Sequence, residues 1–134
     1  MRVIADILWG EDVGHEKEVA YADKRGRVTR LTLLEAFLRI EKDTEEAFTT
    51  VSGRLFPWMV DFRVGRENKR NHRNIERFDE AFAKALEKSS DIYSFYSILT
   101  RDGKLTPEEI RQDLKGLVMA GYDTSSRGAA SALY

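Results

Sequence analysis

The sequence predicts an all-α fold, and three observations support this class. Apolar residues recur at the three-to-four spacing of an amphipathic helix along most of the 134 residues. Only two prolines interrupt the chain, and proline is the residue that breaks helices most strongly. Apolar residues make up 42% and charged residues 34%, which is typical of a chain that folds. Residues 1–134 are expected to belong to one domain.

The composition excludes several classes of function. The 22 basic and 23 acidic residues nearly cancel, to a net charge of −1, so no nucleic-acid partner is expected. The chain has no cysteine and therefore supplies no disulfide or thiolate. His15 and His72 are far apart and are interpreted as surface residues rather than metal ligands. No apolar run reaches the roughly 18–20 residues of a membrane span, and no signal peptide is visible.

The first half of the chain is predicted to contain two helical regions separated by a polar segment. Apolar residues share one face of a helix at 1–9. Glycines then interrupt the pattern, so residues 11–30 are expected to be a loop. A helix follows at 33–40 and resumes at 44. It ends at Phe56-Pro57, because proline disfavours helix in the residue before it.

The second half begins with a mixed charged run and continues as helices. The run from Arg63 to Arg77 is predicted to be a solvated face, because acidic residues lie among its arginines. It leads into a helix that extends to Leu86. A short helix at 92–99 then ends at the turn Asp102-Gly103.

The last segment carries the clearest helix signal. A capping box is predicted at Thr106-Pro107-Glu108-Glu109, with threonine at the cap and glutamate three residues later. An apolar stripe then continues to Tyr134 without a stop signal, over about 40 Å at the usual rise per residue. The chain begins and stops in helical patterns that lack the usual caps, so both ends are expected to be truncated.

The candidate functional site lies within this last helix, at Ala120-Gly121-Tyr122-Asp123-Thr124-Ser125. Acidic and hydroxyl side chains in mid-helix compete for backbone hydrogen bonds, and glycine costs about 1 kcal/mol relative to alanine. The small Ala120 and Gly121 would let a flat, bulky group approach the backbone, and an acid beside an alcohol can carry protons. The alternative is a small-residue stripe that packs against another helix, with Asp123 and Thr124 merely exposed.

These six residues match the pattern Ala/Gly-Gly-x-Asp/Glu-Thr-Thr/Ser of the distal helix of the cytochromes P-450. The chain therefore resembles an internal fragment of a haem-thiolate monooxygenase that ends within that helix. The approach is similar too, because residues 102–110 read as an Asp-Gly turn followed by Leu-Thr and Glu-Glu-Ile. Residues 4–12 and Phe56-Pro57-Trp58 resemble earlier segments of the family, whose central helices the chain would comprise.

The resemblance implies a role for several residues. Asp123 and Thr124 would be the acid–alcohol pair that delivers protons to dioxygen at the haem iron. The residues implied to contact haem are Ala120, Gly121 and Thr124. The residues implied to lie near the substrate are Val118, Met119 and Ser125.

The parent enzyme would insert one atom of dioxygen into a small organic substrate, using haem and electrons from a reductase partner. In the family, the iron is held by a cysteine downstream of the distal helix. Because this chain has no cysteine, it is predicted to be inactive alone. Many eukaryotic relatives are held on the endoplasmic reticulum membrane by an N-terminal anchor, which would lie outside these residues.

Two other classes of protein remain open. Residues 102–109 fit the second half of an EF-hand calcium loop, with Gly103 at position six and Glu109 at position twelve. Ile98 and Thr100, however, stand where carboxylates are needed. A helical interaction domain without catalysis is the second alternative and predicts a closed core. The fragment interpretation instead predicts exposed apolar surface along residues 114–132.

Overall fold

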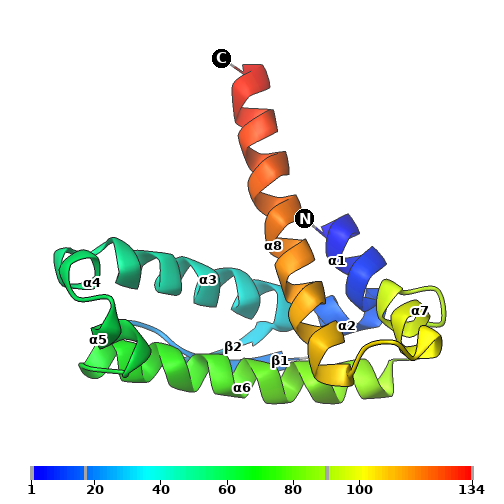
Figure 1. Ribbon diagram of the computed structural model, residues 1–134, viewed down its shortest axis with the longest axis horizontal. Helices are drawn as coiled ribbons and strands as arrows, with labels where there is room; N and C mark the ends of the chain where they lie inside the picture. The colour runs from blue at the N-terminus through cyan, green and yellow to red at the C-terminus, as the bar shows by residue number, and fades with distance from the viewer. Residues whose placement is uncertain (1, 17, 90, 134) are drawn as a thin grey trace. The chain divides into compact units, whose positions relative to one another are not determined.

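A computed structural model describes residues 2–16, 18–89 and 91–133 (Figure 1). The chain divides into two compact units. Unit 1 is formed by Met1–His15 and Ala85–Tyr134, and unit 2 by Glu16–Lys84. Each unit is described by itself.

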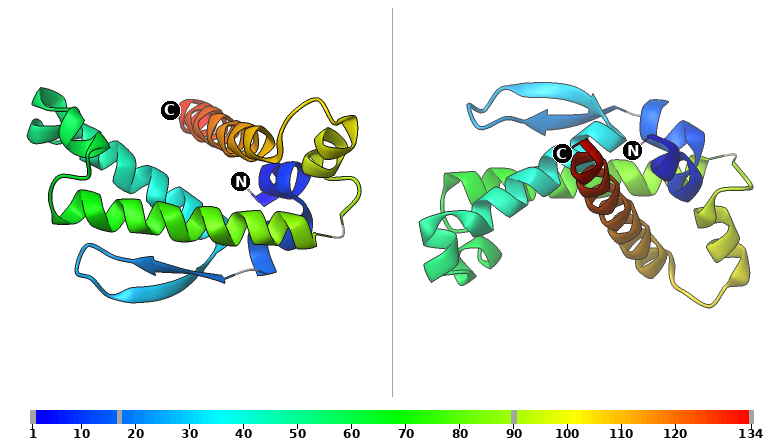
Figure 2. Two further views of the ribbon diagram at one scale, coloured as in Figure 1. Left: turned by 60° about the horizontal axis from the view of Figure 1, so that its bottom comes forward. Right: turned by 90° about the horizontal axis from the view of Figure 1, so that it is seen from above.

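The structure is mainly helical, as the sequence predicts, but the expectation of an all-α fold is wrong in one segment. Within the stretch expected to be a loop, α2 (Glu11–Glu16) is followed by strands β1 (Glu18–Ala22) and β2 (Val28–Thr32). The strands pair antiparallel as a hairpin (Figure 2). Val19 and Tyr21 alternate inward and are each 5% exposed. Two inward positions are too short a period-two signal to separate a strand from a polar loop.

The hairpin turn is closed by its own polar residues. The Asp23 carboxylate accepts hydrogen bonds from the backbone N–H groups of Arg25 and Arg27, at 2.8 and 2.9 Å. Gly26 adopts a φ of +80°, a backbone conformation that residues other than glycine rarely adopt. This local chemistry fixes the conformation of the hairpin turn.

In unit 2 the hairpin lies against α3 (Leu33–Thr49), which begins with a capping box between Thr32 and Glu35. The predicted interruption of this helix near residue 42 is wrong, because 33–49 is continuous. Two short helices follow, α4 (Val51–Leu55) and α5 (Trp58–Asp61).

The long helix α6 (Arg66–Lys88) starts inside the charged run and contacts α3 through aromatic side chains. Phe37 of α3 lies 5.5 Å from Phe78 of α6, centroid to centroid, and Phe78 stacks on Phe82 at 5.4 Å. All three rings are at most 2% exposed. They form the core that holds α3 and α6 together.

Unit 1 contains α1 (Arg2–Trp9), α2, α7 (Phe95–Asp102) and α8 (Pro107–Leu133). Helix α1 packs against both α7 and α8. Trp9 is fully buried and its indole N–H donates to the Leu114 carbonyl at 3.4 Å. Gly103 closes α7 in the left-handed conformation with φ +69°, which confirms the predicted turn.

The capping box predicted for α8 is confirmed. The Thr106 hydroxyl accepts from the Glu109 backbone N–H at 3.3 Å, and the Glu109 carboxylate accepts from the Thr106 backbone N–H at 2.8 Å. The helix then runs unbroken for 27 residues. Among the described residues, no helix combines the length and apolarity that crossing a bilayer requires.

Candidate functional site

Helix α8 carries the residues that the haem-protein resemblance singles out, and they divide between its faces. Ala120 and Thr124 are exposed, Met119 is half-buried and Val118 is fully buried. Ala120 and Thr124 are four residues apart and so share one face. The side chains of Asp123 and Ser125 lie outside the described residues.

Gly121 lies on a different face from Ala120 and Thr124. A Cβ added to Gly121 would come within 2.9 Å of the Ile4 side chain of α1. At this position the helix therefore packs closely against another helix, which favours the small-residue alternative for Gly121 itself.

Three small residues, Ala120, Thr124 and Gly128, follow one another at four-residue spacing and are exposed. The Thr124 hydroxyl donates to the Ala120 carbonyl at 2.7 Å, a local bond that competes with the helix ladder and tends to bend a helix. One turn further, a Cβ added to Gly128 would meet no atom within 4 Å. At Gly128 the described atoms therefore leave space for at least one added carbon.

For a haem, this chain offers the small exposed residues Ala120, Thr124 and Gly128 on α8. No cysteine is present to supply an axial thiolate. Among the described residues, no three His, Asp or Glu side chains gather as a metal site.

The segment considered for calcium is organised as two helix ends. Ile98 and Thr100 lie within α7, and only residues 103–106 connect it to α8. Hydrogen bonds from the backbone and hydroxyl of Thr106 hold the pKa of Glu109 below its ordinary value. The Glu109 carboxylate thus serves as a helix cap here. Calcium binding stays a prediction that titration with Ca²⁺ tests.

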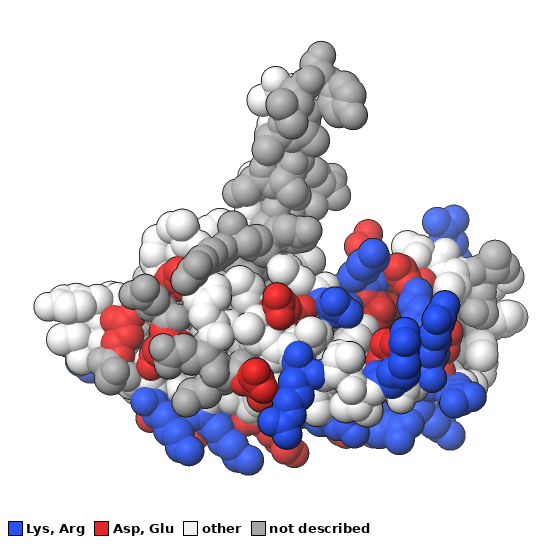
Figure 3. All heavy atoms as spheres, turned by 180° about the vertical axis from the view of Figure 1, so that it is seen from behind, with Lys and Arg blue, Asp and Glu red and all other residues white. Residues whose placement is uncertain are grey.

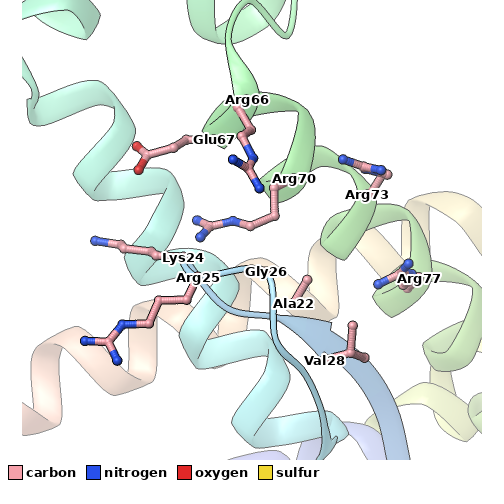
Figure 4. Close-up of a pocket in the computed structure, with 10 residues that line it drawn as sticks. All are labelled: Ala22, Lys24, Arg25, Gly26, Val28, Arg66, Glu67, Arg70, Arg73 and Arg77. Carbon is pink, nitrogen blue, oxygen red and sulfur yellow. The ribbon is translucent and has the colours of Figure 1, made fainter.

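A second site, not predicted from the sequence, lies in unit 2 between the hairpin turn and α6. A cavity of about 510 Å³ opens there, within the roughly 300–1,000 Å³ of small-molecule sites. We call it the basic cavity, because six of its lining residues are cationic. They are Lys24, Arg25, Arg66, Arg70, Arg73 and Arg77. Figure 4 shows Arg66 and Arg70 extending from α6 toward the turn, with Arg73 and Arg77 further along the helix.

Arg70 connects the basic cavity to a buried polar cluster. One of its terminal nitrogens lies 3.4 Å from Asp43, whose same oxygen accepts the Tyr21 hydroxyl at 2.5 Å. The Arg70 and Asp43 side chains are only 12% and 9% exposed. Burial, together with the hydrogen bond to Asp43, raises the pKa of Tyr21 to about 12. The cluster therefore keeps Tyr21 neutral beside the Asp43–Arg70 pair.

Helical spacing was the signal in the sequence that could have revealed the basic cavity. The cationic positions 66, 70, 73 and 77 are separated by four, three and four residues, which places them on one helix face. Glu76 lies elsewhere, where it pairs with Arg63 at 3.7 Å and His72 at 3.3 Å. The run is thus mixed in sequence, and four of its arginines line one cavity, with Glu67 as the acidic residue among them. Figure 3 shows the face turned away in Figure 1, where groups of lysine and arginine side chains have carboxylates among them.

Comparison of the chain with protein-family models, curated proteins and solved structures finds no significant match.

Proposed function

We propose that this chain is a segment of a haem-thiolate monooxygenase of the cytochrome P-450 class and contributes the distal-helix side of its haem site. The observation that carries the proposal is the Ala120–Ser125 motif in the middle of an unbroken helix that begins with a reciprocal capping box. The exposed position of Thr124 supports it, because its hydroxyl lies on the helix surface, where it donates to the Ala120 carbonyl at 2.7 Å.

In such a site, this chain would supply only part of the haem environment. Haem, when bound, supplies the activation of dioxygen for insertion of one oxygen atom into an organic substrate. Ala120 and Thr124 would present a small, close-approach surface to it. Thr124, together with Asp123, would hold and pass protons on that face. The axial cysteine, the reductase contact and most of the substrate pocket would come from the rest of the parent protein.

The first experiment is to sequence the parent transcript beyond the codon for Tyr134. We expect the reading frame to continue into a helix with a Glu-x-x-Arg pair and then into a loop with the cysteine ligand. A stop codon directly after Tyr134 would contradict the proposal, because no thiolate could then reach the iron from this chain.

The second experiment measures coupling in the full-length parent. Thr124→Ala should lower the amount of product formed per electron pair consumed, because the hydroxyl that passes protons is removed. Gly116→Ala is the matched control, since it lies exposed on the same helix with no atom within 4 Å of an added Cβ. Equal coupling in wild type and Thr124→Ala would remove Thr124 from the proton path.

A further inference from the structure

The basic cavity concentrates positive charge in a chain whose net charge is only −1. Carboxylates near these cations are already engaged, Glu46 by Lys24, Asp43 by Arg70 and Asp23 by Arg27. Glu67 also lines the cavity. Within the part of the chain that the structure describes, four of the lining arginines have no carboxylate at ion-pair distance. They are Arg25, Arg66, Arg73 and Arg77. Such a group of like charges is stabilised by a bound anion.

Arg70 adds an independent observation. Its Nε and one terminal nitrogen are buried and have no hydrogen-bond acceptor among the described residues. A buried N–H group without a partner carries an uncompensated desolvation cost. Because Arg70 also lines the cavity, an anion seated there would lie beside this guanidinium and offset its charge. The Asp43 carboxylate fixes the rest of the guanidinium at 3.4 Å, which orients it before any ligand arrives.

The residue types favour phosphate over other anions. Guanidinium groups present paired N–H donors that match two phosphate oxygens at once. Residues three and four apart on a helix have Cβ atoms about 5–6 Å apart, so Arg66, Arg70 and Arg73 can each reach a different group of a chain of phosphates. A single phosphate would engage fewer of them.

The residues that line the cavity also argue against single-stranded nucleic acid and against a membrane surface as partners. Among the described residues, no aromatic side chain lines the cavity, whereas proteins that bind single-stranded nucleic acid offer aromatic rings for base stacking. The apolar part of the lining is limited to small groups such as Ala22 and Val28, which is too little to insert into a bilayer. A concave cavity of about 510 Å³ suits a compact soluble ligand.

We propose that the basic cavity binds a soluble small molecule that carries two or more adjacent phosphate groups. All of its residues lie in unit 2 (Glu16–Lys84), so the proposal is independent of the role assigned to α8. The probe is inorganic tripolyphosphate, titrated calorimetrically into the 134-residue chain at fixed ionic strength. We expect saturable one-to-one binding that is at least about tenfold tighter than that of inorganic phosphate.

Two variants and a matched control test the location. Arg66→Gln and Arg73→Gln each remove one lining cation from an exposed position, and each should weaken tripolyphosphate binding about tenfold or more. Arg30→Gln makes the same change on β2, where the side chain is 81% exposed and outside the cavity, and should bind as wild type does. Circular dichroism checks that all variants keep the helical content of the wild type.

Three outcomes would overturn the proposal. Equal weakening by Arg30→Gln would mean that only general charge attraction is at work. Tripolyphosphate binding no tighter than phosphate binding would exclude a site for adjacent phosphates. Binding of single-stranded RNA or of vesicles rich in anionic lipid, without binding of tripolyphosphate, would assign the surface to a macromolecular partner instead.

Discussion

At the scale of single residues, unit 2 depends on a few polar side chains that are buried with their partners. Tyr21, Asp43 and Arg70 come from β1, α3 and α6 and meet through two hydrogen bonds to one carboxylate oxygen. Removing one member would leave the others desolvated and unpaired, which costs more than the bonds themselves contribute.

The raised pKa of Tyr21 predicts a loss of stability at alkaline pH. The ordinary value is 10.0 and the folded value is about 12, so the unfolded chain loses this proton first. The contribution of Tyr21 is fully present below about pH 10 and is lost as the pH rises through about 12, amounting to roughly 2–3 kcal/mol. Urea unfolding at a series of pH values between these limits measures it.

Tyr21→Phe is the control for this pH dependence, because it keeps the ring and removes the titrating hydroxyl. Its free energy of unfolding should fall less steeply than that of the wild type across the same interval. Identical slopes for the two proteins would show that Tyr21 does not carry the effect.

At the scale of elements, the hairpin is attached to α6 by one amide side chain. The Asn74 oxygen accepts from the Ala22 backbone N–H and the Asn74 nitrogen donates to the Ala22 carbonyl, both at 2.9 Å. Asn74 is 1% exposed. Its amide therefore continues the backbone pairing of β1, as a neighbouring strand would.

Asn74→Ala should destabilise unit 2 by about 2 kcal/mol, because both backbone groups of Ala22 lose their partner in a largely buried place. Urea unfolding followed by circular dichroism measures the change. Glu80→Ala, at an exposed position of the same helix, should change the free energy by less than about 0.5 kcal/mol. Equal effects of the two substitutions would mean that the Asn74 pairing contributes nothing specific.

Helix α8 is held at its start by the capping box. Thr106→Ala removes the hydroxyl that accepts the Glu109 N–H and should cost about 1 kcal/mol of stability. Thermal unfolding of the two proteins gives the difference, with Lys104→Ala in the preceding exposed loop as the control. A Thr106→Ala melting temperature equal to that of the control would show that the cap is not needed.

At the scale of the whole molecule, the two units carry separate optical probes. Trp9 belongs to unit 1 and is fully buried, whereas Trp58 belongs to unit 2 and is 51% exposed. The chain has no other tryptophan. Each single-tryptophan variant therefore reports on one unit.

We expect the Trp58→Phe variant, which retains Trp9, to emit at shorter wavelength than the Trp9→Phe variant, which retains Trp58. The reason is that a buried indole is shielded from water and an exposed one is not. In urea, the emission from Trp9 should shift to longer wavelength as unit 1 unfolds. Equal emission maxima in the native state would contradict the burial of Trp9.

The sequence by itself determined the features that depend on neighbours along the chain. The cap at Thr106, the left-handed turn at Gly103 and the length of α8 follow from signals a few residues apart, and the structure contains all three. The resemblance of residues 120–125 to a distal-helix motif is local as well. Its functional consequence stays a proposal, because an axial ligand has to come from outside these residues.

Only the tertiary structure decided what brings distant residues together. The Asn74–Ala22 pairing joins residues 52 apart, and the Arg70–Asp43 pair joins residues 27 apart. A local pattern can indicate which face of a helix is buried, but it does not encode which distant residue will contact that face. For the same reason the hairpin and the basic cavity were missed. In the sequence alone, a five-residue strand cannot be told from a loop, and a charged run cannot be told from solvated surface. Each is recognised only when a second element is seen to cover one of its faces.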